Sequence, residues 1–221
     1  MKYPVYIVFA QLLFVAGLSA KELRVAPGET LLVNTAQQNL QLDSLVLGDG
    51  AQVKFADGVT RWQVTAARVV VGDNVVIDGR GAPGRAGESG TDAPGMAEEC
   101  ADGIAGGDGF DGLPGGSGVE LSLSWGLAAL GSLQLISDGG AGGEGGRGGR
   151  GQRGGDIGKC RGGQGGAGGS GGAGGSGGDA GEISLVYWPV GDEVDMPAIA
   201  RRVGASAAGG LPGRGGTGGA G

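Results

Sequence analysis

The chain offers few side chains for catalysis, because its 221 residues include no histidine and only two cysteines. Without histidine, the usual Ser–His–Asp triads and histidine-ligated metal sites are excluded. Asp49, Asp73 and Asp78 stand in turns beside valine-rich runs, where carboxylates can serve as acid and base. Asp in such turns more often bonds the nearby backbone. Since no nucleophile–base pair accompanies them, the sequence predicts a protein that is not an enzyme and has no cofactor.

A second set of carboxylates has the spacing of a calcium-binding repeat. The stretch GGDGFDGLP, residues 106–114, carries Asp108 and Asp111 and is similar to the nine-residue GGxGxDxUx pattern of RTX proteins. The next nine residues keep the register but place Glu120 where the pattern has Asp. RTX sites share each ion between tandem repeats. A single full match therefore makes Asp108 and Asp111 weak calcium candidates, and no metal site is predicted.

The first 20 residues have the pattern of a secretory signal peptide. Lys2 gives a positive start, an apolar run covers residues 5–18, and the small residues Ser19 and Ala20 follow. The run is short for a membrane span, and a retained anchor is the alternative. We expect an exported protein, in the periplasm, at the cell surface or outside the cell, with no stable membrane span after signal removal. The net charge of -7 argues against nucleic acid or an anionic membrane as a general partner.

The two cysteines, Cys100 and Cys160, are expected to form a disulfide. The sequence has no CxxC motif and no histidine to complete a zinc site. Two free or metal-bound thiols are the alternative. Export and an even number of cysteines favour the disulfide.

Residues 21–78 have the pattern of short β-strands. Runs of Val, Leu and Ile alternate with polar residues, and turns of Gly, Asp and Asn separate them. LVLGDG from Leu45 is echoed by VVVGDN from Val69, an offset of 24 residues, or about one coil of a parallel β-solenoid. The turn VVIDGRG resembles those of right-handed β-helix proteins such as the pectin-lyase-like folds. This resemblance implies the fold of these residues and not lyase activity.

Residues 79–221 are dominated by glycine at every third position. Three residues per turn is the period of an extended polyproline-II-type helix, in which one residue type lines one ridge. A collagen triple helix is one alternative, but 8 prolines, short runs and frame slips argue against it. A disordered Gly/Ser linker is the other. The runs are Gly81 to Gly90, Gly103 to Gly118 and Gly210 to Gly219, with GGx triplets over 139–155 and 162–178.

This phased pattern resembles the glycine-rich bundle proteins, often called collagen-like, among them the snow-flea antifreeze proteins and the tip domain of some phage tail-fibre adhesins. The resemblance implies polyglycine-II helices that pack through backbone hydrogen bonds. The predicted fold is all-β and irregular: a short parallel β-solenoid with an inserted bundle of polyglycine-II helices. Within residues 79–221, β units are expected at 119–137 and 182–203, and 119–137 and 182–190 should extend the solenoid.

The connections between the runs predict the geometry of the bundle. TDAPGMAEECAD joins the first two runs, DIGKC joins the two GGx runs, and each connection contains one cysteine. If each pair of runs forms an antiparallel hairpin, Cys100 and Cys160 meet at the same end and bond. Since two glycines in three free two ridges for packing, 139–155 and 162–178 should be the most enclosed runs, and 79–90 the least.

Two ridges and four aromatic residues are further candidates for binding. The non-glycine ridge of 139–155 is charged, and we expect a solvated face that keeps the bundle soluble. The ridge of 162–178 is small and flat, so it either packs against a neighbour or meets a flat surface such as ice or a polymer. The aromatic residues are expected in the core or at a cap, with sugar stacking as the alternative. The ridges are Ala141, Glu144, Arg147, Arg150 and Arg153, and Gln164, Ala167, Ser170, Ala173 and Ser176; the aromatic residues are Trp62, Trp125, Tyr187 and Trp188.

Taken together, these patterns predict a secreted or surface-exposed protein with a non-catalytic structural or adhesive role. Its partner would be an unknown surface, glycan or protein ligand. Ice binding of the antifreeze type is the first alternative. A calcium- or glycan-binding module is the second.

Overall fold

The computed structural model describes residues 21–191, 203–206, 208–211, 213–214 and 216. The expected signal peptide, 1–20, lies outside the described residues, as does 192–202 of the expected β unit 182–203. The described chain is mostly β, with parallel sheets and one short 3-10 helix, η1 (Thr35–Gln37). The expected all-β class is therefore confirmed. The chain divides into two compact units by contact.

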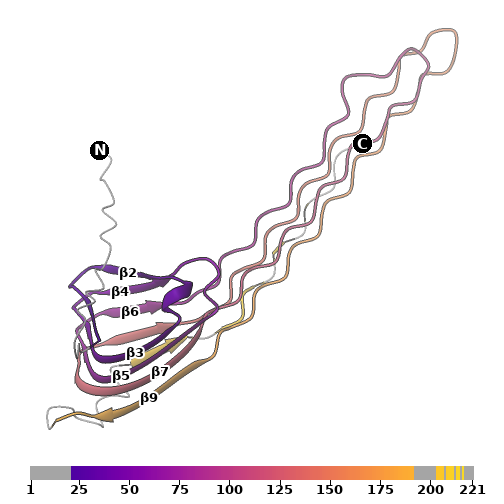
Figure 1. The fold of residues 1–221 in the computed structure, drawn as a ribbon. Coiled ribbons are helices and arrows are strands. Elements are labelled where there is room, and N and C mark those ends of the chain that lie inside the picture. Colours follow the sequence, from indigo (N-terminus) through magenta and orange to yellow (C-terminus); the bar gives the residue numbers. More distant parts are fainter. Residues whose placement is uncertain (1–20, 192–202, 207, 212, 215, 217–221) are drawn as a thin grey trace, which may run out of the picture. The chain divides into compact units, whose positions relative to one another are not determined.

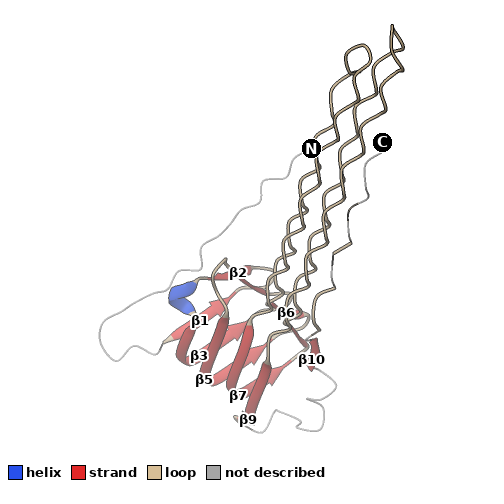
Figure 2. Cartoon of the chain, turned by 90° about the vertical axis from the view of Figure 1, so that its right-hand side faces the viewer, coloured by secondary structure: helices blue, strands red, loops and turns tan. Residues whose placement is uncertain are grey.

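The first unit comprises the chain up to Arg80, Gly118–Asp138 and Ala180–Ala208, and it contains two five-stranded sheets. Consecutive strands alternate between the sheets, and all neighbouring strands are parallel. Figure 1 shows β2, β4 and β6 side by side, and Figure 2 shows the other sheet from β1 to β9. The odd-numbered sheet has the order β1 (Glu22–Val25), β3 (Asn39–Leu47), β5 (Arg61–Val71), β7 (Glu120–Leu130) and β9 (Ile183–Pro189). The even-numbered sheet has the order β10 (Val203–Ser206), β8 (Leu133–Ile136), β6 (Val75–Asp78), β4 (Gln52–Phe55) and β2 (Thr30–Val33).

The internal repeat of the sequence corresponds to the register of the strands. Leu45 of β3 pairs with Val69 of β5, which is the offset of 24 residues between LVLGDG and VVVGDN. The turns after these strands also stack. The Asp73 N–H donates to Asp49 Oδ1 at 2.9 Å, and the Gly50 N–H donates to the Asp73 carbonyl at 2.7 Å. Asp and Gly recur at these turns because each turn hydrogen-bonds the next one.

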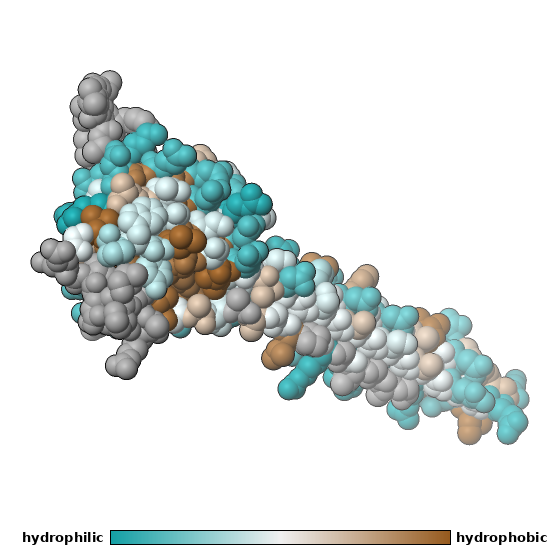
Figure 3. Space-filling view, turned by 90° about the horizontal axis from the view of Figure 1, so that it is seen from below, coloured by the Kyte–Doolittle hydropathy of each residue, from teal (hydrophilic) through white to brown (hydrophobic). Residues whose placement is uncertain are grey.

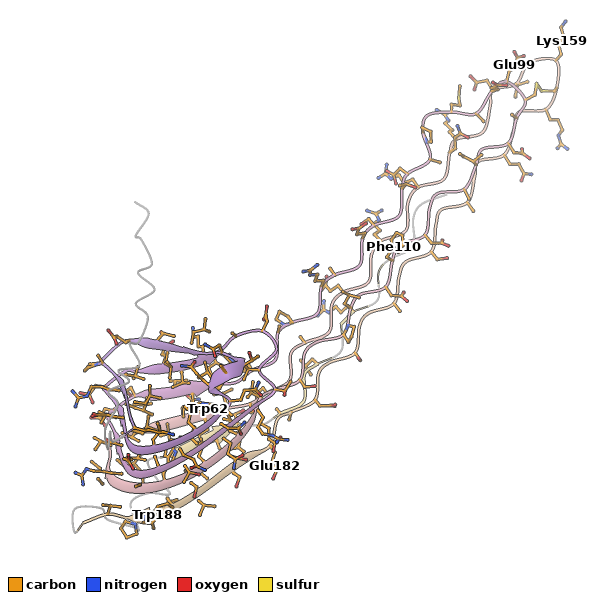
Figure 4. The ribbon with its side chains drawn as sticks, viewed as in Figure 1. Trp62, Glu99, Phe110, Lys159, Glu182 and Trp188 are labelled. Carbon is orange, nitrogen blue, oxygen red and sulfur yellow. A yellow bond between two sulfur atoms is a disulfide. The ribbon has the colours of Figure 1, made fainter. Side chains whose placement is uncertain are left out.

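The core of the first unit lies between the two sheets. Exposed and buried residues alternate from Arg61 to Ala66 in β5, as expected for a strand with one apolar face. Trp62 and Trp125 are fully buried, and Trp62 packs edge to face against Phe55 with ring centroids 5.6 Å apart. Figure 4 shows Trp62 within this unit. The expectation that these two tryptophans are core residues is confirmed.

Two glycine-rich segments interrupt this unit at equivalent points. The crossings from β2 to β3 and from β4 to β5 are short, whereas residues 79–119 separate β6 from β7 and residues 137–182 separate β8 from β9. β7 nevertheless pairs with β5, and β9 pairs with β7. The segment 119–137 and the described part of 182–203 therefore join the same sheets as the strands before residue 79.

The second unit consists of extended glycine-rich runs with no regular strand or helix among its described residues. Backbone N–H groups of one run donate to carbonyl groups of another at 2.7–3.0 Å. The bonds recur every third residue, which is the spacing of the glycines. Run 1 is residues 81–92, run 2 is 102–117, run 3 is 139–155, run 4 is 162–179, and run 5 is the described part of 209–216.

The hydrogen-bond partners give the direction of each run. Gly166 N–H donates to the Gln152 carbonyl and Gly172 N–H to the Gly146 carbonyl, so runs 3 and 4 are antiparallel. The same relation holds for runs 1 and 2. Run 3 is hydrogen-bonded in parallel to run 1 on one side and to run 5 on the other. Run 2 is hydrogen-bonded in parallel to run 4. The unit thus has two layers, runs 1, 3 and 5 in one and runs 2 and 4 in the other, and both expected hairpins are present.

Candidate functional site

Glycine is required inside the second unit because backbones pass in direct contact. A Cβ added at Gly146 would collide with the carbonyl oxygen of Glu88, and one at Gly149 with that of Thr91. At Gly165 an added Cβ would meet only the Gln152 carbonyl oxygen, at 3.8 Å. Glycine loses more conformational freedom on folding than other residues. The hydrogen bonds that this close approach allows offset part of that loss.

Burial within the unit follows the frequency of glycine. No residue of 81–90 is buried, and its glycines are half-buried. The predicted order, with 139–155 and 162–178 most enclosed and 79–90 least, agrees with this burial. The buried glycines of runs 3 and 4 are Gly140, Gly143, Gly146, Gly148, Gly149, Gly155, Gly166, Gly169, Gly172, Gly175 and Gly178.

The connections of both hairpins meet at one end of this unit. Cys100 and Cys160 form a disulfide, with Cα atoms 5.9 Å apart. The Cys100 N–H also donates to the Asp156 carbonyl at 3.2 Å. Figure 4 shows the neighbouring residues Glu99 and Lys159 at this end. This geometry is compatible with the predicted pairing, and the disulfide ties one hairpin to the other.

Three aspartates of run 2 use their side chains to complete the hydrogen bonds of run 4. Their Oδ1 atoms accept from backbone N–H groups on the outward ridge of run 4, where no other described run supplies an acceptor. The weak calcium candidates therefore have backbone partners. In the part of the chain that the structure describes, no cluster of three or more His, Cys, Asp or Glu could hold a metal ion. The pairs are Asp102 with Gln164 at 2.7 Å, Asp108 with Ser170 at 2.7 Å, and Asp111 with Ala173 at 2.6 Å.

Each layer of the second unit presents an exposed face. The arginine face consists of the outward ridges of runs 1, 3 and 5, and the aspartate face consists of those of runs 2 and 4. In Figure 3 hydrophilic residues of this unit appear in teal among paler residues of intermediate hydropathy. The arginine face comprises Pro83, Ala86, Ser89, Asp92, Ala141, Glu144, Arg147, Arg150, Arg153, Leu211 and Arg214, all exposed. The aspartate face comprises Asp102, Ala105, Asp108, Asp111, Pro114, Ser117, Gln164, Ala167, Ser170, Ala173, Ser176 and Asp179, all exposed.

The two ridges selected from the sequence lie on different faces. The ridge from Ala141 to Arg153 is on the arginine face, where the Arg150 N–H donates to Asp92 Oδ1 at 2.7 Å. The ridge from Gln164 to Ser176 is exposed on the aspartate face, so the alternative that it packs against another run is wrong. The carboxylates of run 2 stand beside it. The side chains of this ridge are therefore small and uncharged, but negatively charged carboxylates lie beside them.

The aspartates of the first unit have structural partners. Asp49 bonds the neighbouring turn through Asp73, as described above. Arg80 donates to Asp78 from Nε at 2.8 Å and from Nη2 at 2.6 Å. The guanidinium holds the pKa of Asp78 below its ordinary value of 3.8, against the opposing effect of burial. Asp138 also has a lowered pKa, because the Ala208 N–H and the Ser206 hydroxyl donate to it.

Some exposed apolar residues were not selected from the sequence. Ile104, Phe110 and Leu113 lie at three-residue multiples on a second ridge of run 2, with exposed fractions of 58%, 65% and 54%. Figure 4 shows Phe110 projecting from the run. The signal for this ridge was the apolar residue at every third or sixth position between the glycines. Of the remaining aromatic candidates, Tyr187 packs against the core and Trp188 is exposed on β9.

Comparison with known proteins adds no relative. No protein-family model matches the chain, and neither a curated protein nor a solved structure matches it. Among the described residues, no helix is long and apolar enough to cross a membrane.

Proposed function

We propose that this chain is an exported, non-catalytic protein with a structural or adhesive role at a cell surface. In this proposal the first unit is a short β-solenoid, and the second is an inserted bundle of polyglycine-II helices with a disulfide at one end. The bundle presents side chains to a partner surface, glycan or protein. Along the chain, each glycine hairpin begins after one strand of the first unit and ends before another.

The observation that carries the proposal is the regular hydrogen bonding of the glycine-rich runs. Bonds such as Gly169 N–H to the Gly149 carbonyl and Gly143 N–H to the Leu113 carbonyl, both 2.8 Å, recur at every third residue. A flexible tether does not require hydrogen bonds at a fixed three-residue spacing. The arrangement holds exposed side chains on a fixed backbone at intervals of about 9 Å, three residues at about 3.1 Å each. Rows of evenly spaced side chains suit contact with an extended surface.

The support for the solenoid part comes from the two parallel sheets. Strands alternate between sheets, the Leu45–Val69 register equals the sequence repeat, and the Asp49 and Asp73 turns stack. Stacked coils that bury a shared core are the arrangement of such repeats.

Adhesion is tested with the purified full chain and with cells of the source species. Bound protein is measured by fluorescence on whole cells, on their isolated envelope polymers and on a glycan array. We expect saturable binding to at least one surface, reduced when the exposed ridges are substituted. No binding above that of an unrelated acidic protein would overturn the adhesive role.

Export is tested separately from adhesion. A full-length chain expressed in a bacterial host should be found outside the cytoplasm, with a mature N-terminus at Lys21. Retention of residues 1–20 in a soluble cytoplasmic product would contradict export.

Ice binding is less well supported. The small ridge from Gln164 to Ser176 is exposed, but carboxylates accompany it, and ionised carboxylates keep strongly bound water. Thermal hysteresis of a purified sample measures this activity directly. A clear difference between the melting and freezing points of the sample would favour ice binding over adhesion as the function.

A further inference from the structure

The two faces of the glycine-rich unit carry opposite charge. Among the described residues of the aspartate face, none is basic, and four are acidic: Asp102, Asp108, Asp111 and Asp179. The arginine face has Asp92 and Glu144 but more basic residues: Arg147, Arg150, Arg153 and Arg214. The whole chain is acidic, with a net charge of -7, so the basic face is a local exception.

The arginines of run 3 have no ionic partner among the described residues. The ion pairs of the described residues involve other arginines: Arg24, Arg61 and Arg80. Arg147, Arg150 and Arg153 are exposed and follow one another at three-residue steps of about 9 Å. Their guanidinium groups therefore form an evenly spaced row that is open to an external carboxylate.

The aspartates of run 2 keep acceptor capacity for such a contact. Asp108 and Asp111 each use Oδ1 for a backbone N–H of run 4, and within the described parts of the chain no hydrogen bond or ion pair involves their Oδ2 atoms. A carboxylate accepts a bidentate or end-on guanidinium at the remaining positions. The step from Asp108 to Asp111 is also three residues, so its spacing equals that of the arginine row.

The two rows cannot pair within one chain. Run 3 belongs to one layer and run 2 to the other, and the exposed ridges of these layers face away from each other. Pairing therefore requires two copies. Since a single exposed ion pair contributes little, association requires several pairs in register.

We propose that copies of this chain associate by placing the arginine face of one on the aspartate face of the next. Such a contact joins unlike surfaces, so it leaves a free face at each end and extends into open-ended stacks. The inference rests on the bundle of the proposed function, but it does not require adhesion to another surface. A non-adhesive protein that stacks would refute adhesion and leave this inference intact.

The test uses the purified full chain with its disulfide intact. Sedimentation velocity is measured over a range of protein concentrations at about 20 mM and about 500 mM NaCl, across which the Debye length falls several-fold. We expect association that grows with concentration at low salt and weakens on the order of tenfold or more at high salt. A monomer at every concentration and salt would overturn the proposal.

Two variants test the two faces. Arg147→Gln/Arg150→Gln/Arg153→Gln removes the basic row. Asp102→Asn/Asp108→Asn/Asp111→Asn removes the acidic row, while the amide oxygens still accept from run 4. Each should reduce association to a similar degree. Association as strong as that of the unaltered chain in either variant would contradict the proposal.

A matched control changes charge away from both faces. Lys159→Gln/Arg161→Gln lies near the disulfide and should leave association unchanged. Equal loss in this control would mean that net charge alone governs association, which also contradicts the proposal. If the chain associates only when heparin is added, the arginine row is a polyanion site and the inference is wrong. Circular dichroism of every variant verifies that the fold is retained.

Discussion

Asp108 accepts, through Oδ1, a hydrogen bond from the backbone N–H of Ser170 at 2.7 Å, although the two residues are 62 positions apart. The carboxylate thus accepts a hydrogen bond from the backbone N–H, as a carbonyl group of a neighbouring run does in the interior of the unit. Asp102 and Asp111 repeat the arrangement with Gln164 and Ala173. A pattern that resembles a calcium repeat is in this structure a means of completing the edge of a hydrogen-bonded layer.

Replacing these aspartates should separate charge from hydrogen bonding. Asp108→Ala removes the acceptor for Ser170 and should destabilise the glycine-rich unit by about 1 kcal/mol. Asp108→Asn keeps an acceptor oxygen and should cost less. The difference is measured by urea denaturation followed by circular dichroism. Equal stabilities for the Ala and Asn variants would argue against the hydrogen bond as the contribution of this side chain.

A methyl group should be tolerated only at the surface of the unit. Gly146→Ala places a Cβ against the Glu88 carbonyl oxygen, so we expect a loss of about 1–3 kcal/mol or more from overpacking. The matched control, Gly165→Ala, has its nearest non-adjacent atom at 3.8 Å. Because Ala reduces the freedom of the unfolded chain, the control should be neutral or stabilising by up to about 1 kcal/mol. Equal effects on urea midpoints would mean that the backbones do not touch at Gly146.

The disulfide should contribute substantially to the stability of the glycine-rich unit. Cys100 and Cys160 are separated by 60 residues, and closing a loop of this size constrains the unfolded chain by about 4 kcal/mol in the entropic description. Cys100→Ser/Cys160→Ser should therefore lower the free energy of unfolding by about 2–4 kcal/mol. Peptide mapping without reductant should recover the linked pair from the unaltered chain. Two alkylated free thiols would show that the ends of the hairpins do not meet.

Acid should weaken the ion pair between Asp78 and Arg80. Arg80 lowers the pKa of Asp78 in the folded chain below the ordinary 3.8, so the pair stabilises the fold above that pH. Its contribution is lost as the pH falls through the folded-state pKa. The melting temperature should therefore fall more steeply between about pH 6 and about pH 2.5 for the unaltered chain than for Asp78→Asn. Parallel curves would contradict a stabilising pair.

The parallel β class was predictable because strand patterning is local. The Val-rich runs alternate with period two, and the Leu45–Val69 echo equals the strand register. The antiparallel hairpins were also predictable, since the cysteine-containing connections between phased runs leave few geometries. The lateral order of the five runs was not, because glycine ridges are identical and carry no partner preference. That order depends on side chains such as Asp108, whose partner in run 4 the sequence does not indicate.

The distinction between core and surface aromatic residues was only partly predictable. Trp62 and Trp125 are buried, whereas Trp188 is 41% exposed. All three stand in similar apolar strands. Trp188 differs because it stands at an outward-facing position of β9: it pairs with Gly126, whereas its neighbour Tyr187 pairs with the buried Trp125 and packs against the core. Period-two alternation predicts that Tyr187 and Trp188 face opposite sides, but which of the two faces the core depends on the register with β7.

Amide hydrogen exchange, resolved by residue, tests the central claim that the glycine runs form a hydrogen-bonded unit. The interior N–H groups of Gly143, Gly146, Gly169 and Gly172 donate to carbonyl oxygens at 2.7–2.8 Å, and these glycines are buried. We predict that they exchange orders of magnitude more slowly than an unstructured glycine peptide and open cooperatively. The Gly165 N–H, which donates to no acceptor among the described residues, serves as the internal fast reference. Exchange of all these amides at the unstructured rate would contradict the account.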